Sequence, residues 1–282
     1  MIKFLFFFLS MNTLAAIYGE DSRIETYEAS DELQEIGKSV PALVHRNRIT
    51  LNQFGNYEIS GKPLMEFGFC SDTRFSEETN IANCSSSLVG PNLILTAAHC
   101  FDENYFACKN YSFVFDYVRR SEDLVVRQEF TKDQVYQCKS VVYSKFEKFG
   151  GEDLALIELD RPVVGRKPIK VLTNYRFSPK ENLTMIGYPL GISQKVVSDG
   201  EFLKLDEKNV SFSHSLDSFS VNSGGPIFNK DGNQVGVLVR DYGPNFTDYG
   251  KRDCYDWTRA EKGWAAEANL LSPLSKFFPK SK

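Results

Sequence analysis

The sequence is poor in several kinds of residue whose abundance would point to a particular class of protein. Its 282 residues include three histidines, and lysine plus arginine (33) do not outnumber aspartate plus glutamate (37). The formal net charge is therefore −4, and the isoelectric point lies near 5.6. Because nucleic-acid-binding proteins usually carry a basic face, this composition argues against nucleic acid as a partner.

Closely spaced metal ligands are also missing. No two of the six cysteines have Cys-x-x-Cys spacing, and His45, His99 and His214 are scattered along the chain. Zinc sites usually have pairs of ligands close together in the sequence. We therefore expect no metal site and no other cofactor. The cysteines instead fit disulfide bonds formed in an oxidising compartment.

A long apolar segment occurs in one place, at the N-terminus. Residues 1–19 combine an early basic residue, Lys3, with an apolar core and the small residues Ala15 and Ala16, which is the pattern of a cleavable secretory signal. The alternative is a membrane anchor, but polar residues interrupt the segment, and Glu20 ends it before the roughly 20 residues that a span needs. We expect a secreted or periplasmic protein without stable membrane insertion.

Short strand-like segments fill most of the remaining chain. With 42% hydrophobic residues, the chain can form a real core. β-Branched and alternating segments recur over residues 93–159 and again over 183–242, with turn residues between them, as in antiparallel barrels or sandwiches. We assign a first β-barrel to residues 41–165 and a second to residues 166–282.

Two segments have a different character. Residues 20–40 are acidic and polar, and two interpretations stay open for them: a disordered spacer or a propeptide. Residues 264–278 are rich in alanine and leucine as far as Ser272 and Pro273, and this pattern predicts a terminal helix.

A glycine-rich turn presents a serine in the second strand-rich region. In residues 220–226 (SVNSGGP), Ser223 precedes two glycines between strand-like segments, and glycine lets backbone amides face a ligand. Such a turn alone is ordinary. It gains meaning because His99, in the segment TAAHC, and Asp153, at the start of DLALI, precede it in the chain.

These three side chains are the components of nucleophilic catalysis. A serine hydroxyl attacks well when a base takes its proton, and His99 can be that base because an imidazole changes charge near neutrality. Asp153 would hold the other ring nitrogen and stabilise the imidazolium. We therefore predict catalytic roles for His99, Asp153 and Ser223. The Gly-x-Ser-x-Gly elbow of α/β-hydrolases is absent, since Val221 stands two residues before Ser223.

In this order the segments resemble the chymotrypsin- and trypsin-like serine endopeptidases, from about Cys84 to Tyr242. The segment IGYPLG at residues 186–191, together with Asn222, is most similar to the bacterial glutamyl-endopeptidase branch. The resemblance implies an all-β fold of two antiparallel six-stranded barrels with a C-terminal helix. It also implies hydrolysis of peptide or protein substrates through an acyl-enzyme intermediate, and we expect a monomer.

The six cysteines are expected to form three disulfides. Cys84 and Cys100 flank a predicted hairpin and can close across its strands beside His99. In the family an equivalent bridge braces the histidine. Cys108 and Cys138 bracket two strand-like segments and are expected to form the second pair. Cys70 and Cys254 are the two that remain, and they are expected to form the third pair.

One residue departs from the family pattern where the oxyanion hole is expected. The hole needs the backbone amides of Ser223 and Val221, and family members usually have glycine at the latter position. A β-branched side chain disfavours a positive φ. Three possibilities stay open: the loop reaches the geometry with a negative φ, the hole forms on substrate binding, or the protein is a weak or silent relative that binds protein through the same cleft.

Three residues are candidates for substrate binding. Asp217 stands six residues before Ser223, the spacing at which trypsin-like enzymes place the carboxylate that binds Arg or Lys. Residues 216–219 also resemble bacterial relatives in which an acid at this point need not face the pocket, so both alternatives stay open. Leu238 occupies the position where glutamate-specific relatives carry a histidine, which argues against a glutamate preference. Arg240 and its neighbour Asp241 lie on a strand expected to pair with an extended peptide, although such charges equally protect an exposed edge from aggregation.

The sequence also contains five Asn-x-Ser/Thr sequons. They would accept glycans only in a eukaryotic secretory pathway, and the bacterial-type resemblance argues against that pathway. The sequon asparagines are Asn83, Asn110, Asn182, Asn209 and Asn245.

Overall fold

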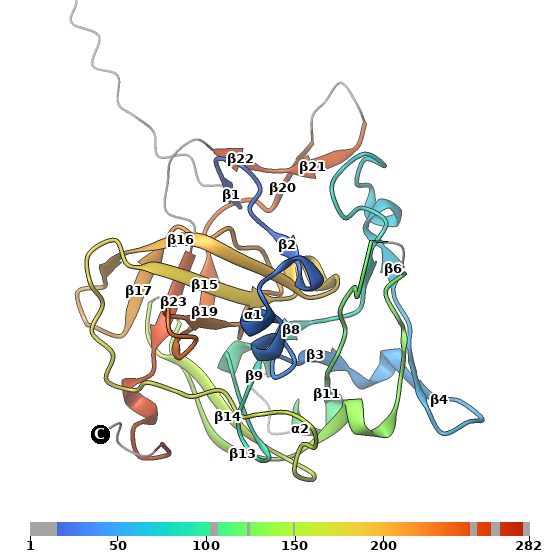
Figure 1. The fold of residues 1–282 in the computed structure, drawn as a ribbon, viewed down its shortest axis with the longest axis horizontal. Coiled ribbons are helices and arrows are strands. Elements are labelled where there is room, and N and C mark those ends of the chain that lie inside the picture. The colour runs from blue at the N-terminus through green and yellow to red at the C-terminus, as the bar shows by residue number, and fades with distance from the viewer. Residues whose placement is uncertain are drawn as a thin grey trace, which may run out of the picture.

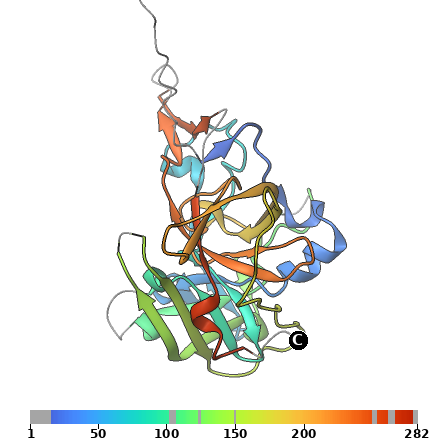
Figure 2. The ribbon, with the colours of Figure 1, turned by 90° about the vertical axis from the view of Figure 1, so that its left-hand side faces the viewer.

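The computed structural model consists mainly of β-strands. It describes residues 16–101, 107–122, 125–148, 150–248, 253–260 and 266–278. Most strands belong to two antiparallel barrels, one formed by the first half of the chain and the other mainly by the second half (Figure 1, Figure 2). The expected all-β double barrel is therefore confirmed.

The first barrel is a nearly closed sheet of seven strands. Their order is β8-β3-β11-β13-β14-β10-β9, and each pairing is antiparallel. Because β8 and β9 follow each other directly in the chain, the two edges of this sheet meet. The strands are β3 Ala42–His45, β8 Cys84–Ser85, β9 Ser87–Gly90, β10 Leu93–Thr96, β11 Tyr111–Val114, β13 Val135–Phe146 and β14 Asp153–Leu159.

The second barrel closes completely. Its order is β15-β18-β19-β23-β17-β16, and an additional pairing of β15 with β16 joins the two ends. A seventh strand, β2 (Ile24–Glu25), comes from the N-terminal segment and pairs with β16. The six barrel strands are β15 Asn182–Gly187, β16 Lys195–Leu205, β17 Ser211–His214, β18 Pro226–Phe228, β19 Gln234–Asp241 and β23 Ala266–Leu270.

The predicted terminal helix at 264–278 is wrong over its described part. Residues 266–270 form β23, which lies between β17 and β19 and pairs with both. A 3-10 helix, η7 (Ser272–Leu274), follows. Alanine favours helices in isolation, but hydrogen bonds to strands on both sides outweigh this preference. The small, buried Ala266 and Ala268 allow close packing inside the barrel.

The N-terminal segment is ordered from residue 16 onward and is not a disordered spacer. Strand β1 (Ile17–Tyr18) pairs with β22 (Arg259–Ala260), and β2 extends the second barrel. Helix α1 (Asp31–Gly37) begins at Ser30, whose hydroxyl accepts a hydrogen bond from the Leu33 amide. Residues 16–19 were assigned to the signal peptide, yet Ala16 and Ile17 are fully buried. Residues 1–15 lie outside the described residues.

The remaining elements are short. Three small sheets join β4 with β5 and β12, β6 with β7, and β20 with β21. These strands are β4 Ile49–Leu51, β5 Tyr57–Ile59, β6 Lys62–Pro63, β7 Thr79–Asn80, β12 Glu129–Phe130, β20 Phe246–Asp248 and β21 Tyr255–Trp257. The short helices are α2 Ala107–Asn110, η1 Thr26–Glu28, η2 Arg46–Arg48, η3 Leu64–Phe67, η4 Ala98–Cys100, η5 Lys132–Gln134 and η6 Pro189–Gly191.

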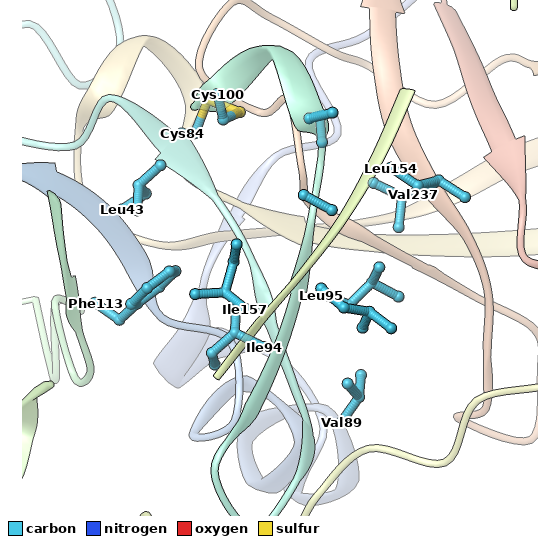
Figure 3. Packing of buried hydrophobic residues seen from close by; sticks show 14 of the residues in the cluster. Leu43, Cys84, Val89, Ile94, Leu95, Cys100, Phe113, Leu154, Ile157 and Val237 are labelled. Carbon is cyan, nitrogen blue, oxygen red and sulfur yellow. A yellow bond between two sulfur atoms is a disulfide. The ribbon is translucent and has the colours of Figure 1, made fainter. Parts of the chain in front are cut away.

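The two barrels share a hydrophobic core. Figure 3 shows Leu95 and Leu154 of the first barrel packed near Val237, which belongs to β19 of the second. The disulfide between Cys84 and Cys100 lies at one end of this cluster (Figure 3). This packing holds the end of β10, which precedes His99, and the start of β14, which carries Asp153, against the second barrel.

All three expected disulfides are confirmed. They are Cys84–Cys100, Cys108–Cys138 and Cys70–Cys254. In the part of the chain that the structure describes, we find no helix with the length and apolarity required to cross a bilayer.

Candidate active site

His99 and Asp153 form a hydrogen-bonded pair. The His99 Nδ1 and Asp153 Oδ2 atoms are 2.7 Å apart, and the His99 backbone amide donates to Asp153 Oδ1 at 2.9 Å. The Asp153 side chain is 2% exposed, whereas 31% of the His99 side chain remains open to solvent. This is the geometry in which a carboxylate orients an imidazole and leaves Nε2 available as a base.

The strand pairing explains why these two residues meet. Strands β10 and β14 are antiparallel, with Thr96 opposite Ala155. His99 follows the end of β10 in η4, and Asp153 is the first residue of β14, so both lie at the same edge of the first barrel.

The second barrel also holds Asp153 in place. The Asp153 amide donates to the side-chain oxygen of Asn269 at 2.5 Å, and Asn269 Nδ2 donates to the Gly151 carbonyl at 3.4 Å. Asn269 lies on β23 and is fully buried. The sequence did not reveal the role of Asn269, because its segment was predicted to be a helix. A helix at these residues gives no reason to place Asn269 beside the Asp153 amide.

Ser223 lies in a turn that permits glycine alone at the next position. Gly224 has a φ of +84°, and a Cβ atom there would lie 2.2 Å from the Ser85 carbonyl oxygen. The Ser223 carbonyl accepts a hydrogen bond from the Ser85 amide at 2.8 Å. The turn is therefore anchored directly to β8 of the first barrel, which carries Ser85.

The three predicted catalytic residues line one pocket. His99, Asp153 and Ser223 all contribute to its wall, together with Val221. Among the described residues, no hydrogen bond joins Ser223 Oγ to His99 Nε2. Such contacts are often long in ligand-free enzymes and shorten in the substrate complex, so the geometry agrees with the predicted triad without a closed Ser–His contact.

Val221 adopts a positive φ of +75°, so the first of the three possibilities, a negative φ, is wrong. A β-branched residue in the left-handed region costs roughly 1–3 kcal/mol. Such strain persists where neighbouring groups enforce it. The Val221 carbonyl accepts a hydrogen bond from Ser85 Oγ at 3.0 Å. Among the described residues, the amides of Val221 and Ser223 donate to no other group, so both are free to bind a substrate oxygen.

Asp217 is not part of this pocket. Its Oδ1 accepts a hydrogen bond from the Tyr18 amide at 2.9 Å, and its Oδ2 accepts from the Ser22 amide and hydroxyl at 3.0 and 2.8 Å. Burial raises the pKa of this carboxyl. The structure therefore corrects the prediction that Asp217 binds substrate: its two oxygens hold the N-terminal segment, which the sequence gave no reason to place there.

Of the other two substrate-binding candidates, one reaches the pocket. Leu238 is buried in the core of the second barrel, so its side chain is not in the pocket wall. Arg240 lines the pocket, donates to the Gly151 carbonyl at 2.7 Å and pairs with Glu267 at 3.3 Å. Arg240 thus braces the loop before Asp153.

Asp241, which follows Arg240 on β19, lines the pocket that Asp217 does not reach. It shares the pocket wall with Ser223 and Tyr242. Oδ1 accepts a weak hydrogen bond from the Gly243 amide at 3.4 Å, while Oδ2 is buried and has no partner among the described residues. Burial raises the pKa of Asp241 to about 7.

The close grouping of Cys84, Cys100 and His99 resembles a metal site at first sight. The two sulfur atoms form a disulfide, so they cannot act as thiolate ligands. The bridge instead braces η4, which carries His99.

The double barrel and the paired His99 and Asp153 define a trypsin-like peptidase architecture. The family model for the trypsin-like peptidase domain matches residues 84–237, which include Ser223. The chain therefore belongs to the family of proteins with a trypsin-like peptidase domain.

Among proteins with a curated description, the chain is similar to the venom peptide isomerase heavy chain of Agelenopsis aperta. The two are 25% identical over 190 residues, which cover 55% of this chain and 74% of that protein.

Proposed function

We propose that the protein is a secreted serine endopeptidase that cleaves peptide bonds through an acyl-enzyme intermediate. The observation that carries this proposal is the hydrogen-bonded His99–Asp153 pair in the same pocket as Ser223. His99 would take the proton of the Ser223 hydroxyl as Oγ attacks the substrate carbonyl, and would return it to the leaving amine.

The free amides of Val221 and Ser223 complete this proposal. Together they would bind the oxyanion of the tetrahedral intermediate, and the loss of one such donor typically lowers the rate by about 10²–10³. Residues 239–241 extend β19 beyond its pairing with β18, in which Pro226 lies opposite Val237. An extended peptide could therefore add along this part of β19.

We further propose that the pocket prefers a cationic substrate side chain, with Asp241 as the acceptor. The unpartnered Oδ2 of Asp241 supports this preference. Similarity of residues 186–191 to the glutamyl-endopeptidase branch supports a relationship in fold, but Leu238 is a core residue, and we do not propose a preference for glutamate.

A labelling experiment tests the catalytic role directly. A fluorophosphonate probe should react with the folded wild-type protein, and the Ser223→Ala variant should not react. Mass spectrometry of a peptide incubated with the protein should show two fragments whose summed mass exceeds that of the peptide by one water. A product of unchanged mass would indicate isomerisation, the reaction named for the relative from Agelenopsis aperta.

A second candidate is a catalytically silent relative that binds protein in the same pocket. The strained φ of Val221 supports it, because a hole that collapses cannot stabilise an oxyanion. Absence of probe labelling in a processed, folded chain would favour this candidate over the enzyme.

A further inference from the structure

The loop before Ser223 is held by groups from three separate parts of the chain. The Ser220 carbonyl accepts a hydrogen bond from the Leu190 amide at 2.8 Å, and the Val221 carbonyl accepts one from Ser85 Oγ at 3.0 Å. The third group is Asn245. Its Oδ1 accepts from the Ser220 amide at 2.7 Å, and its Nδ2 donates to the Ser220 hydroxyl at 2.9 Å.

These contacts fix the direction of one peptide unit. The Ser220 carbonyl and the Val221 amide belong to the same trans peptide, so they point in opposite directions. With the carbonyl bound to Leu190, the Val221 amide is turned away from Leu190 and stays free. If this peptide rotated, the Ser220 carbonyl would replace the Val221 amide as the group facing a substrate oxyanion, and the hole would lose a donor.

Val221 makes this rotation more favourable than it is in a protein with glycine there. A glycine has no steric reason to leave the left-handed region, whereas valine relieves strain by leaving it. Leu190, which binds the Ser220 carbonyl, is itself left-handed, with a φ of +47°. The loop therefore depends on outside contacts, and Asn245 supplies two of them.

We propose that Asn245 is a positioning residue for the oxyanion hole: by holding Ser220, it keeps Val221 in the conformation that leaves the Val221 amide free. This inference rests on the proposed function. Asn245 is also tied to the N-terminal segment, because its carbonyl accepts a hydrogen bond from the Thr258 amide and the Thr258 carbonyl accepts one from the Ile17 amide.

The test is a double-mutant cycle that combines Asn245→Ala with Val221→Gly. The rate of fluorophosphonate labelling is the first readout, because the phosphoryl oxygen of the adduct occupies the oxyanion hole. Asn245→Ala should label about tenfold more slowly than the wild type, as expected when a donor is misplaced for most of the time. Combined with Val221→Gly, the same substitution should change the rate by less than about threefold, because glycine removes the strain.

Two control variants separate the amide contacts from other effects. Asn245 belongs to a sequon, and Thr247→Ala removes the sequon, together with the 2.7 Å contact between the Thr247 and Thr258 hydroxyls, without altering the Asn245 residue itself. This variant should label like the wild type. Asn245→Asp keeps the acceptor for the Ser220 amide and loses the donor to the Ser220 hydroxyl, so it should recover most of the rate lost in Asn245→Ala.

The cycle distinguishes failure of this inference from failure of the proposed function. Suppose that the wild type reacts with the probe. If Asn245→Ala then lowers the labelling rate by the same factor with and without Val221→Gly, Asn245 has a structural role alone. If Asn245→Ala does not lower the labelling rate, Asn245 has no role in positioning the oxyanion hole. If the wild type does not label, the proposed function fails. Thermal unfolding then still tests the coupling between Asn245 and Val221. Asn245→Ala should lower the midpoint temperature of unfolding by about 2–4 °C in the wild-type background, and by clearly less in the Val221→Gly background. Equal shifts would overturn the inference.

Discussion

Two aspartates considered as substrate-binding residues, Asp217 and Asp241, differ in their hydrogen-bond partners. Asp217 has hydrogen-bond donors at both oxygens, all from the N-terminal segment. Asp241 lines the pocket that contains Ser223, and its Oδ2 atom is buried without a hydrogen-bond partner in the described chain. A buried carboxylate oxygen without a donor is costly unless a ligand supplies one, so Asp241 is a better candidate than Asp217 for contact with substrate.

The first prediction concerns Asp241 and pH. With a pKa of about 7, this carboxyl is mostly neutral at pH 6 and mostly charged at pH 8. Cleavage of a reporter with Lys or Arg at the scissile bond, relative to a reporter with a neutral residue, should therefore increase about tenfold across this range. Asp241→Asn should make the ratio independent of pH. An unchanged pH dependence in that variant would show that the preference arises elsewhere.

The second prediction concerns His214, a fully buried residue on β17 whose two ring nitrogens have no partner among the described residues. Burial lowers the pKa of His214 to about 3, whereas the unfolded chain titrates near 6.5. Below pH 6.5 the unfolded state binds a proton that the folded state does not. The free energy of unfolding should therefore fall by about 2 kcal/mol between pH 7 and pH 5 from this residue alone.

His214→Leu should remove that part of the acid sensitivity. Urea unfolding at the two pH values measures it, and His45→Leu, at a partly exposed position, serves as the control. If the wild type and His214→Leu lose the same free energy on acidification, His214 does not titrate as described.

At the scale of single elements, β23 has the most unexpected role. It completes the second barrel and also carries Asn269, which accepts the hydrogen bond from the Asp153 amide. A strand of one barrel thus supports the aspartate of the other.

The third prediction is that Asn269→Ala destabilises the protein and weakens the catalytic pair. Loss of the acceptor leaves the buried Asp153 amide unpaired, so the free energy of unfolding should fall by about 1–3 kcal/mol. Fluorophosphonate labelling should slow as well, because Asp153 is less well fixed. Asn182→Ala, at an exposed position on β15, is the matched control and should change neither quantity. If the Asn269→Ala variant reacts with the probe as fast as the wild type, β23 is not needed to place Asp153.

The elements that the sequence predicted well are those whose pattern is local. Strands β10 and β14 lie inside the expected strand-rich region 93–159, because their β-branched and aliphatic segments are bounded by turns. The segment at 266–270 was predicted wrongly, because its partners β17 and β19 lie far away in the sequence and helix propensity was the local signal. Residues 125–128, inside the expected strand-rich region 93–159, are likewise not in a strand.

The candidate site was predictable to the extent that short motifs carry it. Residues 99, 153 and 223 stand in recognisable surroundings, and the structure brings them to one pocket. The supporting residues, Ser85 and Asn245, have no motif: their roles depend on the register between distant segments. The prediction for Asp217 failed for the same reason, since the N-terminal segment that occupies it is about 200 positions away and carries no sign of its destination.

At the scale of the whole molecule, the N-terminal segment joins the second barrel. Tyr18 and Ser22 bind Asp217, and β2 adds to β16. Arg23 is fully buried, pairs with Asp21 and stacks on Phe219. This segment therefore supports the chain that leads into the nucleophile turn.

The fourth prediction rests on the proposed secretion: the mature chain should begin at Ala16 or Ile17. Cleavage after residue 19 would remove β1 and the Tyr18 amide that donates to Asp217, which would leave a buried carboxylate with fewer donors. Intact-mass measurement of the secreted protein gives the answer. A first residue at position 20 or beyond would contradict the structural role given to β1.

The hydrogen bond that the Asp153 amide donates to the Asn269 side chain has a practical consequence for protein engineering. Fragments divided between the barrels, near residue 165, would each lack a part that the acid–base pair needs, so neither half should react with the probe alone. Recovered reactivity on mixing would then report reassembly, and the chain could serve as a split reporter whose signal requires the two halves to dock in native register.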